Sequence, residues 1–247
     1  MPGSEIIQVV TVMFVATTFR TIFGFGEALI AVPLLALVIP VQIAAPIAVL
    51  ASILIASFVV SRDWRHIHLK SAGWLVFSTL FGIPLGVLLL KVAPESTVKI
   101  ILATAIFIFS GYSFFLPSHA ILKDERFAWV FGFIAGVCGG SYGVNGPPLV
   151  IYGSLRGWSP ERFRATLQGY FLPASIFGMC GYALAGLWTA TVSTLFLWSL
   201  PAIFIGIFLG RILSRKIDTR RFDYLVRVGL IFIAILLFFQ AIRFQGA

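Results

Sequence analysis

Long apolar runs separated by short polar connections make up most of this chain. A helix that crosses a membrane needs about 20 mostly apolar residues. The hydrophobic pattern therefore predicts an all-α, polytopic integral membrane protein. Six segments are predicted to be single transmembrane helices: 44–61, 71–90, 98–116, 164–187, 192–213 and 223–242.

Two further apolar stretches, 5–39 and 127–155, are each interrupted by a glycine-rich kink. The kinks are FGFG at 23–26 and GGSYGVNGPP at 139–148. The arms beside them are about 17 and 13 residues long in the first stretch and about 13 and 10 in the second. Such arms are short for a membrane crossing at 1.5 Å per residue. We expect re-entrant or broken helices whose arms meet near the middle of the membrane.

The composition excludes several classes of protein. Apolar residues make up 60% of the chain and charged residues 11%, whereas about a quarter of the residues in a soluble domain are charged. A soluble enzyme, a secreted disulfide scaffold and a disordered chain are all excluded. The N-terminal residues have no basic segment and no cleavage site, so a removable signal peptide is not expected.

The basic residues test the predicted topology, because cytoplasmic loops carry an excess of Lys and Arg. If each kinked stretch enters and leaves on one side, 14 of the 18 basic residues fall on one face and 3 on the other, with Arg20 between them. The net charge of +9 then reflects orientation in the membrane and not a nucleic-acid partner. The 14 are Arg62, Arg65, Lys70, Lys123, Arg126, Arg156, Arg162, Arg164, Arg211, Arg215, Lys216, Arg220, Arg221 and Arg227.

Two sequence matches suggest an internal duplication. The motif GIPLG at 82–86 resembles GIFLG at 206–210, which lies 124 positions later, and Gly24 matches Gly143, which lies 119 positions later. We therefore predict two repeats, 1–126 and 127–247, within one transmembrane domain. Each has a broken or re-entrant helix and three transmembrane helices, and three crossings invert the second repeat. Inverted repeats with broken helices are typical of secondary transporters. Coincidence between glycine- and leucine-rich segments is the alternative.

The kinks also predict an anion site. Non-helical backbone inside a membrane must line a cavity or be buried in protein. Asn145 is a good N-cap and Pro147 suits a first helical turn, so an arm beginning near Gly146 would point free N–H groups at its kink. An arm beginning near Gly26 would do the same. Two such helix N-termini can bind an anion. Alternatively, the glycines only allow close helix packing.

Arg20 and Glu27 are the charged residues deepest in the apolar pattern. An Arg at the centre of a membrane helix costs about 2.5–3.5 kcal/mol on insertion scales, so it usually has a partner and a role. Three interpretations stay open for Arg20: contact with an anionic substrate, a structural pair with Glu27, or a shallow position from which it reaches the interface. Glu27 could also carry a proton.

A polar residue in the fourth predicted span completes the candidate site. Gln168 could bind substrate or hydrogen-bond a partner helix. Arg164 could anchor the cytoplasmic interface or attract anions to a cavity mouth. No set of metal ligands and no cofactor site is predicted. The residues predicted to bind substrate are Arg20, Gly24, Gly26, Glu27, Ser141, Asn145, Gly146 and Gln168.

The kinks resemble the motifs of a known family. The GFG at 24–26 followed by ALIAVPLL at 28–35, the glycines and GPPL of the second kink, and residues 162–168 are similar to the TauE/SafE sulfite exporter family. The resemblance covers nearly the whole chain. It implies a multi-pass transporter of the bacterial inner membrane that carries sulfite, sulfoacetate or another small organosulfur or organic anion. Glu27 departs from the family pattern, in which a small residue is common.

These observations predict a secondary transporter of a small anion, and the family resemblance implies that it is an exporter. It would work by alternating access around a midplane site formed by the two kinks. An anion channel is the main alternative. No cluster of nucleophile and base lies at membrane depth, so an enzyme is not expected. The expected partners are the anion, the lipid bilayer and a possible coupling proton or ion, and the oligomeric state stays open.

Overall fold

The computed structural model describes residues 3–94, 104, 122, 124–214, 228 and 235. Apart from residues 104, 228 and 235, the predicted spans 98–116 and 223–242 therefore lie outside the described residues. The described ranges are helical, in agreement with the predicted fold class. Their helices are α1 (Gly3–Phe23), α2 (Glu27–Leu35), α3 (Val41–Asp63), η1 (Trp64–His66), α4 (Leu69–Val92), α6 (Phe127–Tyr142), α7 (Gly146–Leu155), α8 (Pro160–Leu184) and α9 (Ala190–Ser214).

Four of these helices are long and apolar enough to cross a membrane: α1, α3, α4 and α9. Three of them cover predicted spans. The fourth predicted span, 164–187, corresponds to α8, which has 25 residues. Polar side chains such as Arg164 and Gln168 make α8 less apolar than those four helices. The protein is a multi-pass helical membrane protein.

The first kink is a short break between α1 and α2. Gly24 and Gly26 have φ angles of +84° and +95°, a region that glycine adopts without steric cost. The break lets α2 fold back against α1. The prediction that both arms are short was wrong for α1, whose 21 residues span about 31 Å. The helix includes the polar start of the chain, where Glu5 in the first turn favours the helix N-terminus.

The second kink is shorter than the sequence predicted. Helix α6 continues through residues 139–142, and the break comprises 143–145, with Gly143 at φ +70°. Gly140 stays helical because it packs against the backbone of α4, where a side chain would overlap Ile83. Some of the predicted kink glycines therefore serve helix packing, as the alternative interpretation proposed.

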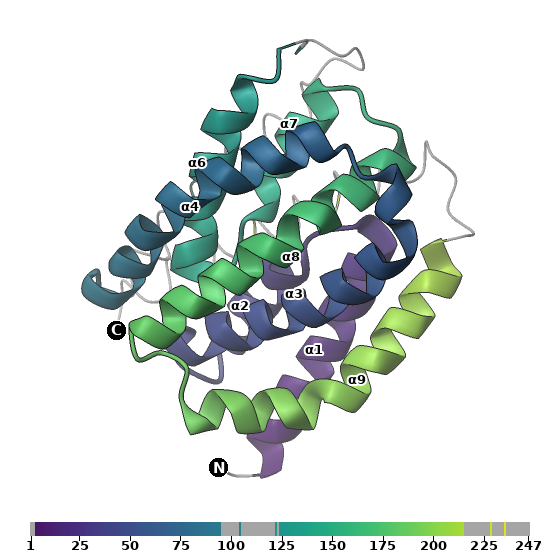
Figure 1. The fold of residues 1–247 in the computed structure, drawn as a ribbon. Helices are drawn as coiled ribbons and strands as arrows, with labels where there is room; N and C mark the ends of the chain where they lie inside the picture. Colours follow the sequence, from purple (N-terminus) through teal and green to yellow (C-terminus); the bar gives the residue numbers. More distant parts are fainter. Residues whose placement is uncertain are drawn as a thin grey trace.

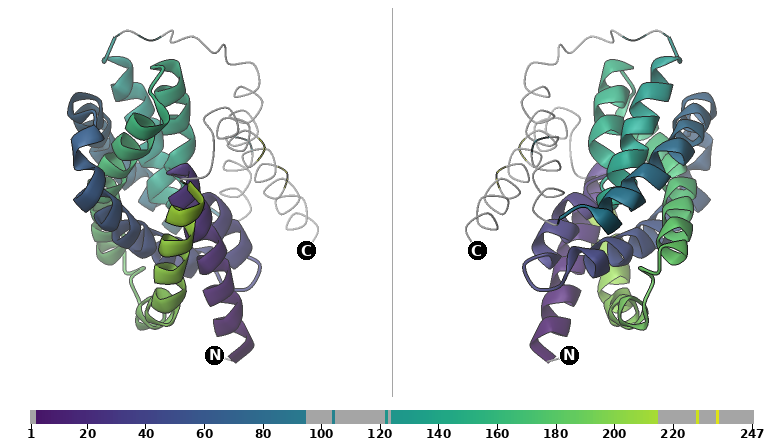
Figure 2. Two further views of the ribbon diagram at one scale, coloured as in Figure 1. Left: turned by 90° about the vertical axis from the view of Figure 1, so that its right-hand side faces the viewer. Right: turned by 90° about the vertical axis from the view of Figure 1, so that its left-hand side faces the viewer.

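The helices form two close pairs on either side of a central pair. Helices α4 and α6 lie side by side, as do α1 and α9 (Figure 1). Helices α3 and α8 pack against each other between these pairs, and α8 also contacts α4 while α3 contacts α9. The views in Figure 2 show α1 and α9 running alongside each other from the end near the N-terminus. The short helices α2 and α7 lie against their own hairpin partners.

The two matched glycine motifs make matching contacts. A Cβ at Gly82 would overlap the backbone of Phe133, and a Cβ at Gly206 would contact the backbone of Phe14. Phe14 and Phe133 are 119 positions apart, as are the kink residues Gly24 and Gly143. In the same way, a Cβ at Gly86 would overlap the backbone of Val137, and a Cβ at Gly210 would overlap the backbone of Thr18. Each motif therefore lets a long helix approach the first arm of the other hairpin.

The central pair of helices meets at two serines. The Ser175 hydroxyl of α8 donates a hydrogen bond to the Ser52 hydroxyl of α3, with 2.8 Å between the oxygens. This buried hydrogen bond joins α3 to α8.

Candidate functional site

Arg20, in the last turn of α1, is the centre of a buried polar cluster. Its Nη1 group donates to Glu27 Oε2 at 2.5 Å and to Ser52 Oγ at 2.7 Å. Its Nη2 group donates to Gln168 Oε1 at 2.8 Å. The ring of Phe171 lies 4.7 Å from the guanidinium carbon, a cation–π contact. Residues of α2, α3 and α8 therefore contact the guanidinium group that α1 carries.

The geometry bears on the three interpretations of Arg20 and excludes one of them. Arg20 is 3% exposed and Glu27 1% exposed, so a shallow Arg20 that reaches the interface is wrong. The residues form an ion pair. The break at 24–26 reverses the chain and brings the first turn of α2 back beside the last turn of α1. A pair within the protein is therefore present, and contact with substrate stays a prediction.

The two breaks meet at a very small cavity of about 20 Å³. Such a volume holds about one water molecule. It brings together five of the predicted site residues from both hairpins. The cavity is lined by Arg20, Gly26, Glu27, Ala28, Leu29, Ser52, Gly143, Val144, Asn145, Gly146 and Phe171.

The two helix N-termini at this cavity are not equivalent. The first turn of α2 has free backbone N–H groups, because Ile30 makes the first helical bond back to Gly26. The first turn of α7 contains two prolines, which have no N–H group. Asn145 precedes α7 but makes no side-chain cap, so the predicted capping role is wrong. Its side chain hydrogen-bonds the buried hydroxyl of Tyr170.

Ser141 lies apart from the rest of the predicted site. Its hydroxyl donates to the backbone carbonyl of Val137, one turn earlier in α6. The backbone at Ser141 packs against Gly86 of α4. Ser141 thus belongs to the α4–α6 contact, and neither cavity described in this section is lined by it.

A larger cavity of about 340 Å³ lies on the other side of Gln168. We call it the basic vestibule. Among its described lining residues, three are arginines and one, Glu161, is acidic. It is lined by Thr21, Gly24, Phe58, Val59, Arg62, His66, Glu161, Arg164, Ala165, Gln168, Arg211 and Ser214.

Gln168 separates the basic vestibule from Arg20. Its side chain accepts a hydrogen bond from Arg20 and donates one to the carbonyl oxygen of Gly24 at 3.0 Å. Gln168 and Gly24 both line the basic vestibule, whereas Arg20 lines the small cavity. One amide side chain therefore stands between the large space and the buried guanidinium.

Comparison with known proteins gives two matches. The family model for the sulfite exporter TauE/SafE matches residues 9–237. The chain is 25% identical over 225 residues to a probable sulfite/organosulfonate exporter TauE of Cupriavidus necator, with 87% of each chain covered. No solved structure matches the chain.

The chain belongs to the TauE/SafE sulfite exporter family. The family model covers both hairpins, the four helices around Arg20 and the basic vestibule. The resemblance seen in the kink motifs is thereby confirmed. Glu27, where a small residue was expected from the family pattern, is the ion-pair partner of Arg20 in this TauE/SafE protein.

Sequence reasoning missed two partners of Arg20 in this TauE/SafE protein. Ser52 and Phe171 lie in predicted spans, and nothing in the linear pattern brings them to Arg20. A serine inside an apolar span, such as Ser52, suggests a buried polar contact but does not identify its partner. Arg62 and Arg211 were assigned only to the basic face, and the structure gathers them around one cavity.

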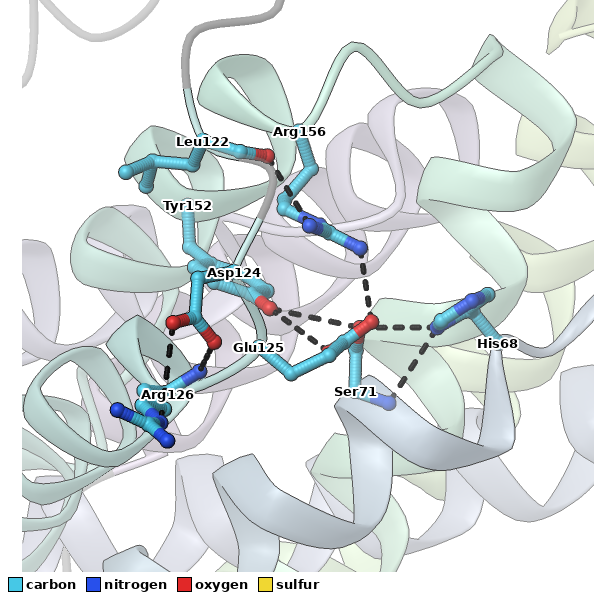
Figure 3. Close-up of polar contacts among 8 residues, drawn as sticks. All are labelled: His68, Ser71, Leu122, Asp124, Glu125, Arg126, Tyr152 and Arg156. Atoms are coloured by element: carbon cyan, nitrogen blue, oxygen red, sulfur yellow. Dashed lines mark hydrogen bonds and ion pairs between the residues drawn. The ribbon is translucent and has the colours of Figure 1, made fainter.

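A second polar cluster lies at the ends of other helices (Figure 3). Glu125 accepts hydrogen bonds from Arg156 at 2.7 Å and from Ser71 at 2.7 Å. Tyr152 of α7 donates to the same carboxylate at 3.2 Å. His68 contacts Ser71 and caps α4. This cluster ties the C-terminal end of α7 to the start of α4 and holds α7 in place.

Proposed function

We propose that this TauE/SafE protein is a secondary carrier that exports a small anion across the bacterial inner membrane. The substrate is a sulfur oxyanion or a small sulfonate, such as sulfite or sulfoacetate. The name of the Cupriavidus necator relative, a probable sulfite/organosulfonate exporter, supports this class. The observation that carries the proposal is the buried Arg20, held one side chain away from a basic cavity.

The basic vestibule is the cytoplasmic access to the site in this proposal. Arg62, Arg164 and Arg211 give it a positive potential that attracts anions from the cytoplasm. The anion then displaces Gln168 from Arg20 and binds the guanidinium together with N–H groups at the start of α2. Gly24 and Gly26 let the backbone approach it. Asn145 and Gly146 close the site from the other hairpin.

Transport follows by alternating access between two inverted repeats, 1–126 and 127–247. The matching contacts of the motifs at 82–86 and 206–210 support this arrangement. The Ser52–Ser175 hydrogen bond joins a helix of the first repeat to a helix of the second. One repeat rocks against the other around this contact and opens the small cavity, first to the cytoplasm and then to the other side.

A carrier accounts for the cavities better than an anion channel. A conducting channel needs a continuous water-filled path. Here the basic vestibule ends at Gln168, and the cavity between the breaks has room for about one water molecule. An anion of any predicted class must therefore move protein groups in order to pass.

Counterflow in proteoliposomes tests this function. Liposomes containing the purified protein are loaded with unlabelled sulfite or sulfoacetate, and uptake of the radiolabelled anion is measured. A carrier shows faster uptake into loaded than into empty liposomes, because the loaded carrier returns faster. Equal uptake into both would indicate a channel, and no uptake of either anion would contradict the proposed substrate class.

A further inference from the structure

The ion pair in the small cavity is incompletely satisfied. Glu27 Oε1 and Arg20 Nε have no hydrogen-bond partner among the described residues, although both residues are buried. Buried polar atoms without partners are uncommon and call for an explanation. Both groups line the cavity where the two hairpins meet. The pair therefore presents unused hydrogen-bonding capacity to whatever enters that cavity.

The charges of this cavity are balanced when it is empty. Arg20 contributes one positive charge and Glu27 one negative charge. An entering anion adds a second negative charge within contact distance of the carboxylate. Two like charges at such a distance in a buried site cannot both persist, and one is neutralised by a proton. A sulfonate group keeps its charge because it is a strong acid, so the proton must go to a carboxylate. That carboxylate is Glu27 or, when the anion is sulfoacetate, the ligand's own carboxylate, and a Glu27→Gln variant distinguishes the two.

No other group at the cavity can play this part among the residues that the structure describes. Ser52 from α3, Phe171 from α8 and Asn145 from the second break face the pair, and all are uncharged. Gln168 from α8, also uncharged, bonds Arg20. The Tyr170 hydroxyl on α8 is engaged with Thr79 and Asn145.

We propose that Glu27 binds one proton each time an anion binds Arg20, so that anion binding at this site is linked to proton binding. This inference rests on the proposed function. In the empty state Glu27 acts as an internal anion, held by Arg20 at the start of α2. When the substrate arrives, a proton released by a buffer acid in the solvent joins the Glu27 carboxylate, and the Arg20 N–H groups turn to the substrate oxygens. The protonated Glu27 is then neutral and donates a hydrogen bond. The proton offsets one negative charge of the substrate.

Calorimetry measures this proton directly. Sulfoacetate is titrated into the purified protein at about pH 7.5, where the ligand does not titrate, in several buffers with different ionisation enthalpies. The dependence of the binding heat on the buffer gives the number of protons taken up per anion. We expect about one proton. We also expect affinity to rise about tenfold for each unit by which the pH is lowered, as linkage requires.

The matched variants are Glu27→Gln and Glu125→Gln. The first should bind sulfoacetate without proton uptake and with little dependence on pH, because no carboxylate competes for Arg20. The second removes a carboxylate from the cluster at the end of α7 and should still take up one proton. Thermal melting and size-exclusion profiles establish that each variant is folded.

The outcomes separate this inference from the proposed function. Sulfoacetate binding by the wild type with no proton uptake would overturn the proton proposal and leave the carrier intact. Proton uptake that persists in Glu27→Gln would assign the proton to another group and would also overturn the proton proposal. If neither sulfoacetate nor sulfite binds the wild type at all, the proposed substrate class fails, and the proton proposal, which depends on it, fails with it.

Discussion

One guanidinium group links four helices in this protein. Arg20 of α1 contacts Glu27 of α2, Ser52 of α3 and Gln168 of α8. A buried charge is tolerable in the membrane only when neighbouring groups replace its hydration. The same group is therefore both a structural centre and the strongest attraction for an anion.

Replacing Arg20 should abolish substrate binding. In Arg20→Ala the Glu27 carboxylate loses its partner, and breaking a buried pair costs about 3–5 kcal/mol of stability. The double variant Arg20→Met/Glu27→Gln removes both charges and should recover much of that stability but not bind sulfite or sulfoacetate. Thermal shift on adding either anion measures this.

Arg65→Ala is the control for this test, because Arg65 is exposed and stacks on Trp64 outside both cavities. It should keep the full thermal shift. A normal shift in the double variant would show that the substrate does not depend on Arg20.

Gly24 is confined by both its backbone and its neighbours. Its φ of +84° is strained for any other residue, and a Cβ would lie 2.7 Å from Cγ of Arg164. Gly24→Ala should therefore lower the melting temperature by several degrees, since the strained backbone alone costs about 1–2 kcal/mol. Gly73→Ala is the matched control.

Gly73 lies in α4, where a Cβ would have no neighbouring atom within 4 Å. Its replacement should leave the melting temperature unchanged or raise it, because Ala is the better helix former. A Gly24→Ala variant as stable as Gly73→Ala would contradict the role given to the first break.

At the scale of the elements, glycine surfaces determine how closely the helices pair. The backbones of α4 and α6 touch at Gly82 and Gly86, and α9 approaches α1 in the same way at Gly206 and Gly210. In lipid, such close packing replaces the hydrophobic effect as the force between helices. The two hairpins are therefore held by helices from the opposite half of the chain.

The two glycine contacts should differ in their tolerance of a methyl group. At Gly82 a Cβ would overlap the backbone of α6, which cannot yield without separating the helices. At Gly206 the nearest atom would be the Phe14 carbonyl oxygen at 3.1 Å, a tight contact that a small shift relieves. Thermal unfolding in detergent should show a larger loss of stability for Gly82→Ala than for Gly206→Ala. Equal losses would mean that the two contacts are equally tight.

The sequence was informative about elements that have a local signal. Apolar runs located α3, α4 and α9, and glycines marked the two breaks. It predicted too long a break at the second kink. A glycine that interrupts a helix and a glycine that packs against a neighbouring helix cannot be told apart in one sequence. Gly140 needed the position of α4 to be interpreted, and Gly139 needed that of Asn145. Arg20 and Glu27 stood out by their charge, whereas Ser52 and Phe171 did not.

At the scale of the whole molecule, the contact between α3 and α8 lies between the two outer pairs of described helices. Ser52 and Ser175 meet there, and the helices that contact them contribute to both cavities. If the two halves rock against each other, this contact lies on the axis and moves least. A sliding motion of one half would instead separate the two serines.

A cross-link between these serines distinguishes rocking from sliding. In the double variant Ser52→Cys/Ser175→Cys, oxidation should join α3 to α8, since the two hydroxyl oxygens are 2.8 Å apart. We expect the oxidised form to retain most of the counterflow of its own reduced form. Loss of counterflow on oxidation, recovered by reduction, would favour sliding.

The charged pair occupies only one of the two matched hairpins. Positions 119 residues after Arg20 and Glu27 are Gly139 and Gly146, and neither has a side chain to titrate or to bind an anion. A duplicated ancestor with identical halves would present the same energy to both sides of the membrane. In the proposed carrier the inward-facing and outward-facing states have no such symmetry to make them equal in energy. Half-saturation by the anion is then expected at different concentrations on the two faces, whereas the gradients alone set the direction of net flow.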